Sequence, residues 1–150
     1  MDDGSNDGTA EATEAMRDQM GDIDLIFIQQ NHEGAGAARN QALKEASFDY
    51  VAFLDADDEW LPEKLERSLE VLNSTESILV SHDYIRREAD GSEFVVLECS
   101  KNFNYGGDPY VRLYRQGYIA TSGVVARRDA VLAAGGFDEN LPNAQDFDLW

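Results

Sequence analysis

The pattern of apolar and polar positions divides the chain into alternating helices and strands. Residues 23–28 and 50–54 are apolar runs of strand length, while residues 35–46 carry small side chains and Leu43 at helical spacing. This order predicts a strand, a helix and a second strand that together form a βαβ unit. The run at 50–54 is nearly all apolar, which is typical of a strand buried on both faces.

Helices are predicted on both sides of this unit. Thr9 is a suitable N-cap for a helix over residues 10–20, which Gly21 would end. Pro62 fits the first turn of a later helix, because its missing N–H costs little there. Apolar residues at helical spacing predict that this later helix buries one stripe, formed by Leu65, Leu69 and Leu72.

The second half of the chain predicts antiparallel strands. Residues 78–81 resemble a third strand, and residues 84–97 resemble two strands around a turn at Asp90 and Gly91. The rest is predicted as a loop at 102–108, a helix at 109–115, a strand or loop at 119–126 and a helix at 128–134. The fold class is therefore α/β: one domain over residues 1–150, with a mostly parallel sheet flanked by helices and a late antiparallel addition.

Composition narrows the class of protein. With 150 residues, 43% of them hydrophobic, the chain can bury one core. No apolar run approaches the roughly 20 residues of a membrane span, and no signal-sequence pattern follows Met1. We expect a cytoplasmic protein, either free or peripheral at the inner face of the membrane. Cys99 is the single cysteine, so an internal disulfide is excluded and a packing role is expected.

The formal net charge of −18 excludes nucleic acid as an expected partner, because phosphate binding depends on Lys and Arg. Only three of the twelve basic residues are lysine: Lys44, Lys64 and Lys101. Two interpretations remain open. The protein is adapted to a salt-rich cytoplasm, where ions screen its self-repulsion, or it is an ordinary acidic protein.

Three carboxylates end the strand at 50–54. The segment 50–58 reads YVAFLDADD, which places Asp55, Asp57 and Asp58 directly after the apolar run. Ligands of open α/β sheets gather beyond the carboxyl ends of the strands, and carboxylates there can bind a hard divalent cation. The alternative is a solvated acidic turn that ends the strand.

Residues 2–9 (DDGSNDGT) form a second acidic signature, and residues 31–40 (NHEGAGAARN) lie between the two. Later motifs are GGFDE at 135–139 and QDFDLW at 145–150. In this order and separation the segments resemble the nucleotide-sugar-binding half of the family 2 glycosyltransferases, inverting enzymes with the GT-A fold. Family members normally have a strand and a helix before the first motif and more chain after the last. We therefore expect a fragment of a longer domain.

The resemblance implies a donor site for a nucleoside diphosphate sugar, with uracil as the expected base. Asp3 would contact the base and Asp55 the ribose. Asp57 would coordinate a Mg²⁺ or Mn²⁺ ion that bridges the diphosphate oxygens. Asp58 would contact the sugar or the surroundings of the metal, and Arg39 would lie near the diphosphate. The residue-level alternative for Asp57 is the strand-ending turn.

The resemblance also implies that Asp146 is the catalytic base, which takes the proton from the hydroxyl of a saccharide, lipid-linked or protein acceptor. Gln145 stands where the family usually has Glu, which removes one negative charge beside this base. Asp148 is a rival for the role, and an N-cap of a helix is the alternative function of Asp146. Residues 121–123 are expected on the acceptor side.

Other residues have two interpretations each. Gly34 and Gly36 would form a flexible turn near the diphosphate, or they would allow close packing of a helix. Trp60 would stack on a sugar or anchor the helix that follows it. His32 and His82 have no partner at metal-binding spacing, and we expect ordinary polar or core histidines.

Three further hypotheses remain. An EF-hand-like calcium loop is suggested by its key positions, which hold Asp3, Ser5, Asp7, Gly8 and Glu14. A dinucleotide-binding site is suggested by Gly34 and Gly36 with Asp55 downstream, although Arg39 replaces the third glycine. The third is a non-catalytic relic of a glycosyltransferase that binds a nucleotide without turnover.

Overall fold

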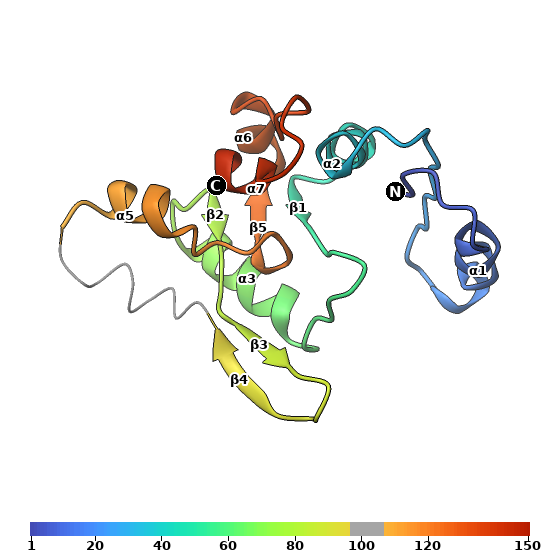
Figure 1. The fold of residues 1–150 in the computed structure, drawn as a ribbon, viewed down its shortest axis with the longest axis horizontal. Coiled ribbons are helices and arrows are strands. Elements are labelled where there is room, and N and C mark those ends of the chain that lie inside the picture. Colours follow the sequence, from blue (N-terminus) through green and yellow to red (C-terminus); the bar gives the residue numbers. More distant parts are fainter. Residues whose placement is uncertain (97–106) are drawn as a thin grey trace.

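The computed structural model describes residues 1–96 and 107–150 (Figure 1). The predicted packing role of Cys99 and most of the loop predicted at 102–108 fall outside the described residues. Within the described part of the chain, no helix is both long enough and apolar enough to cross a lipid bilayer.

A three-stranded sheet forms the centre of the fold. Its order is β1 (Tyr50–Ala52), β5 (Val125–Arg127) and β2 (Leu79–Val80). β5 runs antiparallel to both neighbours, with Val51 opposite Ala126 in the register. β1 and β2 therefore point in the same direction without pairing. The α/β class is confirmed, but each pair of named strands in the described chain is antiparallel, where mostly parallel pairing was predicted.

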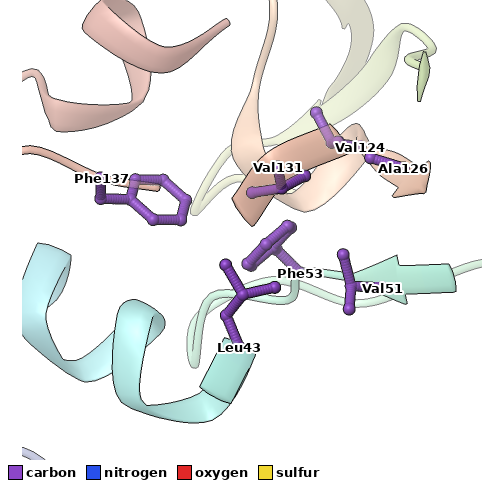
Figure 2. Packing of buried hydrophobic residues seen from close by; sticks show 7 residues of the cluster. All are labelled: Leu43, Val51, Phe53, Val124, Ala126, Val131 and Phe137. Carbon is purple, nitrogen blue, oxygen red and sulfur yellow. The ribbon is translucent and has the colours of Figure 1, made fainter. Parts of the chain in front are cut away.

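The core lies where helices α2 (Ala35–Glu45) and α6 (Arg128–Ala133) meet this sheet. Figure 2 shows apolar side chains from both sides of the core converging on Phe53. The Phe53 ring meets the Phe137 ring edge to face, with 5.4 Å between ring centroids. Full burial stabilises each large apolar side chain by about 1.5–3 kcal/mol. The buried cluster comprises Leu43, Val51, Phe53, Val124, Ala126, Val131 and Phe137.

Helix α3 (Lys64–Ser74) packs against β2 and β5 through a different face from the predicted one. Leu72 is fully buried, but Leu65 is 41% exposed, so the predicted leucine stripe is wrong at that position. The buried positions are Lys64, Ser68 and Leu72, spaced four residues apart. The long aliphatic stem of a lysine can fill an apolar site in this way. Leu65 instead lines an apolar hollow of about 390 Å³ beside β1.

The first predicted helix is divided into two pieces. Helix α1 (Thr9–Ala15) is followed by a 3₁₀ turn, η1 (Arg17–Gln19). The prediction of Thr9 as N-cap is wrong, because Gly8 holds that position with a φ of +87° and Thr9 is already helical. The Asp7 carboxylate accepts hydrogen bonds from the Thr9 N–H (3.2 Å) and hydroxyl (2.6 Å), and so stabilises the first turn.

The strand predicted at residues 23–28 is not formed. An isolated parallel bridge joins Asp2 to Gln29, with Asp2 N–H donating to the Ile28 carbonyl (2.8 Å). Ile23 and Ile26 are 66% and 61% exposed. A strand requires a neighbour that pairs with it over several residues, and the apolar pattern alone supplies no such neighbour.

The predicted antiparallel addition is confirmed. Strands β3 (Tyr84–Arg87) and β4 (Glu93–Val96) form a hairpin that extends away from the central sheet in Figure 1. Gly91 has a φ of +85°, as a hairpin turn requires. Helix α5 (Pro109–Gln116) begins with Pro109 in its first turn, and Asp108 caps it by accepting a hydrogen bond from the Tyr110 N–H (2.9 Å).

Candidate functional site

The acidic loop that follows β1 is anchored through Asp55. Arg39, on α2, donates to the Asp55 carboxylate at 2.5 Å. The Asp55 backbone N–H donates to the Ser122 hydroxyl at 2.9 Å. The guanidinium of Arg39 also lies 5.4 Å from the centroid of the Phe137 ring. Both the carboxylate and the backbone of Asp55 are therefore held in place, and the positive charge of Arg39 is paired with this carboxylate.

Asp57 and Asp58 lie exposed at the tip of the same loop. The Asp58 N–H donates to the Asp55 carbonyl at 3.1 Å, so the turn predicted as the alternative is present. No described hydrogen bond or ion pair involves the carboxylate of Asp57 or Asp58. Their oxygen atoms suit a hard divalent cation that keeps waters and substrate phosphates in its shell. Across residues 1–96 and 107–150, no three acidic, His or Cys side chains gather into a metal site.

The amino-terminal motif is organised around the Asp3 carboxylate. Oδ1 accepts hydrogen bonds from the Gln30 amide (2.8 Å) and the Glu33 N–H (2.9 Å). Oδ2 accepts from the Gly34 N–H (2.9 Å) and lies 2.8 Å from His32 Nδ1. The Glu33 N–H leads these donors in holding the pKa of Asp3 below its ordinary value. A base contact by Asp3 stays a prediction, and it would compete with these four partners.

Asp2 organises the amino-terminal loop, a structural role that the sequence pattern was not used to predict. It is 6% exposed, and its carboxylate accepts from the Ser5 N–H (3.2 Å) and the Gln29 amide (2.6 Å). Hydrogen bonding from Ser5 lowers its pKa. An Asp three residues before a Ser is a local turn pattern that could have identified this role. Next to it, Gly4, Ser5 and residues 29–33 line a polar hollow of about 650 Å³.

Asp146 lies on the short helix α7 (Gln145–Leu149). The Thr121 hydroxyl lies 3.4 Å from Asp146 Oδ2, and the Trp150 indole N–H donates to Thr121 Oγ1 at 3.3 Å. Asp148 is exposed, whereas Asp146 is half-buried. Of the two aspartates on α7, Asp146 is thus the one whose carboxylate contacts a side chain of another described segment.

Gln145, which stands where the resemblance predicts Glu, packs closely against Gly36. Gln145 is 8% exposed, and its amide donates to the Leu141 carbonyl at 2.7 Å. A Cβ on Gly36 would lie 3.3 Å from Gln145 Cγ. A neutral amide avoids the cost of a buried charge at this position. The contact supports the packing interpretation of Gly36.

Asn40 connects α2 to the GGFDE motif. Its amide donates to the Phe137 carbonyl (2.8 Å) and to Glu139 Oε1 (2.8 Å), while its carbonyl accepts from the Phe137 N–H (2.9 Å). A Cβ on Gly136, whose φ is +72°, would lie 2.5 Å from Asn40 Oδ1. Glycine is therefore required at 136. The GGFDE motif is thus fixed to α2, and its Phe137 ring lies beside the Arg39 guanidinium. The residue pattern did not predict this role of the motif.

Trp60 closes the acidic loop at its far end. Its indole N–H donates to the Ser122 carbonyl at 2.9 Å, and the Lys64 ammonium lies 4.1 Å from its ring centroid. These contacts support the anchoring interpretation of Trp60. Burial lowers the pKa of Lys64 to about 8, because desolvation penalises the charged amine.

Comparison with known sequences decides the family. The sequence model of glycosyl transferase family 2 matches residues 1–133. The chain belongs to glycosyl transferase family 2. This membership confirms the resemblance drawn from the motifs and, with it, the GT-A-like α/β class. It argues against the calcium-loop and dinucleotide-site hypotheses, since the segments that suggested them fall within the family match.

Two curated relatives of this family 2 chain are named as biosynthetic glycosyltransferases. The amylovoran biosynthesis glycosyltransferase AmsB of Erwinia amylovora is 32% identical over 131 residues, which cover 85% of this chain and 43% of the relative. The teichuronic acid biosynthesis glycosyltransferase TuaG of Bacillus subtilis, named as putative, is 42% identical over 72 residues (48% of this chain and 28% of the relative).

A third relative carries a more specific name. It is the UDP-Glc:alpha-D-GlcNAc-diphosphoundecaprenol beta-1,3-glucosyltransferase WfaP of Escherichia coli, 32% identical over 131 residues, which cover 87% of this chain and 48% of the relative. The family 2 chain spans about half the length or less of these three relatives.

Proposed function

We propose that this chain forms the donor-binding part of an inverting glycosyltransferase that moves a sugar from a UDP-sugar to an acceptor hydroxyl with the help of Mg²⁺ or Mn²⁺. The observation that carries the proposal is the state of the acidic loop. Asp55 is locked by Arg39 and Ser122, whereas Asp57 and Asp58, two and three residues later, keep exposed carboxylates. A loop that is anchored at its start and has free carboxylate oxygens at its tip suits the binding of a metal-bound diphosphate.

Each residue of the site has a distinct role in the proposed reaction. Asp57 would hold the metal ion, whose chemistry is to neutralise charge on the departing diphosphate. Asp146 takes the proton from the acceptor hydroxyl as the oxygen forms its bond to the anomeric carbon. The bond from that carbon to the diphosphate oxygen breaks, its electron pair leaves with UDP, and the configuration inverts. Asp3 and Asp55 would hold the base and the ribose, with Arg39 and Asp58 beside the diphosphate and the sugar.

The relatives' names support the donor and acceptor classes. The name of the Escherichia coli relative specifies a UDP-linked sugar and a saccharide attached to a lipid diphosphate. We therefore propose a UDP-sugar donor and a lipid-linked saccharide acceptor, which would place the reaction at the cytoplasmic face of a membrane. Free saccharide and protein acceptors are the alternatives that an acceptor screen would compare.

Calorimetric titration of UDP into the protein with Mn²⁺ tests the donor site. We expect micromolar binding that disappears when EDTA replaces Mn²⁺, and molar KCl is included in a parallel titration in case folding needs salt. Absence of binding by a folded protein would contradict the proposal.

Release of UDP from UDP-glucose and UDP-N-acetylglucosamine then separates enzyme from relic. Asp146→Asn should leave UDP affinity unchanged and reduce turnover by about 10²- to 10⁴-fold, the usual contribution of a general base. Asp24→Asn, which changes an exposed carboxylate elsewhere, is the control. Binding without metal-dependent turnover in the unmodified chain would favour the non-catalytic relic.

A further inference from the structure

The 3₁₀ turn η2 (Thr121–Gly123) contacts both ends of the acidic loop through one residue. The Ser122 hydroxyl accepts from the Asp55 N–H at 2.9 Å, and the Ser122 carbonyl accepts from the Trp60 indole at 2.9 Å. The segment between these two contacts contains the exposed carboxylates of Asp57 and Asp58, together with Glu59. Ser122 therefore fixes where the tip of the loop begins and where it ends.

Thr121, the preceding residue of the same turn, contacts helix α7, which carries Asp146. Thr121 is 3% exposed, and its hydroxyl lies between Asp146 Oδ2 (3.4 Å) and the Trp150 indole N–H (3.3 Å). One hydroxyl can accept from the indole and donate to the carboxylate at the same time. The Trp150 ring also packs on Phe53, with 5.7 Å between centroids, so this arm reaches the core.

The turn itself has little freedom to move. The Gly123 N–H donates to the Ala120 carbonyl (2.9 Å), and the Val124 N–H donates to the Thr121 carbonyl (3.0 Å). A Cβ on Gly123 would lie 3.1 Å from the His82 carbonyl, so backbone from the end of β2 fits closely against the turn. The chain continues directly into β5, the middle strand of the sheet. Ser122 and Thr121 are therefore neighbours in a closely packed turn, and no loop separates them.

We propose that Thr121 and Ser122 are positioning residues that couple occupation of the donor loop to the placement of Asp146. The inference rests on the proposed function, since it takes the acidic loop as the donor site and Asp146 as the base. Donor binding at the loop would shift Ser122, and Thr121 would transmit the shift to the Asp146 carboxylate.

The two tryptophans of the chain provide separate signals for the two sets of contacts: those of Ser122 with the acidic loop, and those of Thr121 with α7. Trp60 donates to Ser122 and Trp150 donates to Thr121, so the two indole N–H signals in a ¹⁵N spectrum report the two sets. UDP with Mg²⁺ is the probe, because paramagnetic Mn²⁺ would broaden the indole signals near the loop, and Trp60→Phe assigns the signals. In the unmodified chain both indole signals should shift with the same UDP concentration dependence. A shift of the Trp60 signal alone would overturn the coupling and leave the donor site intact.

Two variants of Thr121 test whether its hydroxyl carries the coupling. Thr121→Val removes the hydroxyl at nearly constant volume, and the Trp150 signal should then stop responding to UDP while the Trp60 signal still responds. Thr121→Ser keeps the hydroxyl and should restore the response. An unchanged Trp150 response in Thr121→Val would overturn the proposal, provided that its backbone spectrum is that of the folded chain. Failure of UDP to shift either indole would instead reject the donor site, and the coupling with it.

Turnover of UDP-glucose provides a second readout. Thr121→Val should lower kcat about tenfold with little change in KM, the effect of losing one hydrogen bond to a charged group. Ser122→Ala should weaken UDP binding because the Asp55 N–H loses its acceptor. Equal changes of both parameters in both variants would indicate a general loss of structure and contradict separate positioning roles.

Discussion

Asp3 and Asp57 belong to the two acidic motifs of the chain, but their carboxylates have opposite surroundings in the structure. The Asp3 carboxylate accepts hydrogen bonds from three donors and lies beside His32 Nδ1, all from residues 30–34 and at distances of 2.8–2.9 Å. The Asp57 carboxylate is exposed and has no described partner. A carboxylate whose lone pairs are filled by its own chain shapes a loop, whereas one left to solvent can bind a ligand. Hydrogen-bond occupancy thus distinguishes two carboxylates that the acidic motifs alone do not.

Replacing Asp57 tests this contrast with the largest expected effect. Asp57→Asn removes the proposed metal ligand without removing any internal hydrogen bond, so UDP affinity in Mn²⁺ should fall by at least about 100-fold while the melting temperature stays the same. Calorimetric titration and a thermal melt measure the two quantities. Unchanged UDP affinity would remove Asp57 from the donor site.

Replacing Asp3 should give the opposite pattern. Asp3→Asn places an NH₂ group against donors such as the Glu33 and Gly34 N–H groups, so the loop loses its organising contacts. The melting temperature should fall, by about 2–4 °C for each kcal/mol lost in a domain of this size. UDP affinity should fall only moderately. A variant that melts normally but binds no UDP would show that the proposed base contact, rather than loop organisation, is the main role of Asp3, and so would break the contrast with Asp57.

Sequence reasoning was most successful where a pattern has one local cause. The turn at Gly91 and the start of α5 at Pro109 follow from local backbone preferences. The apolar run at 50–54 contains β1, but the strand ends at Ala52 and only Val51 and Phe53 of the run are buried, where burial on both faces was predicted. Sequence reasoning failed where pairing or packing over long distances decides the outcome. Residues 23–28 lack a pairing neighbour, and the buried face of α3 begins at Lys64 rather than Leu65.

The candidate site shows the same division. The motifs identified the carboxylates, but no pattern in the sequence predicted that Arg39 would bind Asp55 or that one turn would contact both Asp55 and Asp146. These contacts join residues that are 16, 67 and 25 positions apart. Contacts of this kind depend on how distant segments pack together, which a single sequence does not specify residue by residue.

Lys64 provides a smaller test, based on a buried cation beneath the acidic loop. Its pKa of about 8 lies below the ordinary 10.5. Between these values only the unfolded chain holds the proton, so unfolding takes up a proton and the free energy of unfolding rises with pH. The gain is up to about 3 kcal/mol by pH 10.5. Chemical denaturation from pH 7 to 10.5 should show this rise relative to Lys64→Met, and parallel curves for the two proteins would contradict the burial of the charge.

Salt provides the smallest expected effect and separates exposed from internally bonded carboxylates. At a net charge of −18, exposed carboxylates such as Asp57 repel their neighbours, and molar KCl reduces the screening length to about 3 Å. The hydrogen bonds of Asp2 and Asp3 act at contact distance and should persist. We therefore expect the melting temperature to rise by a few degrees with added KCl, by a similar amount in the unmodified chain and in Asp3→Asn. A melting temperature that falls steadily with KCl would reject salt adaptation. If the difference in melting temperature between the unmodified chain and Asp3→Asn disappeared in KCl, the Asp3 contacts would be mainly long-range electrostatic interactions.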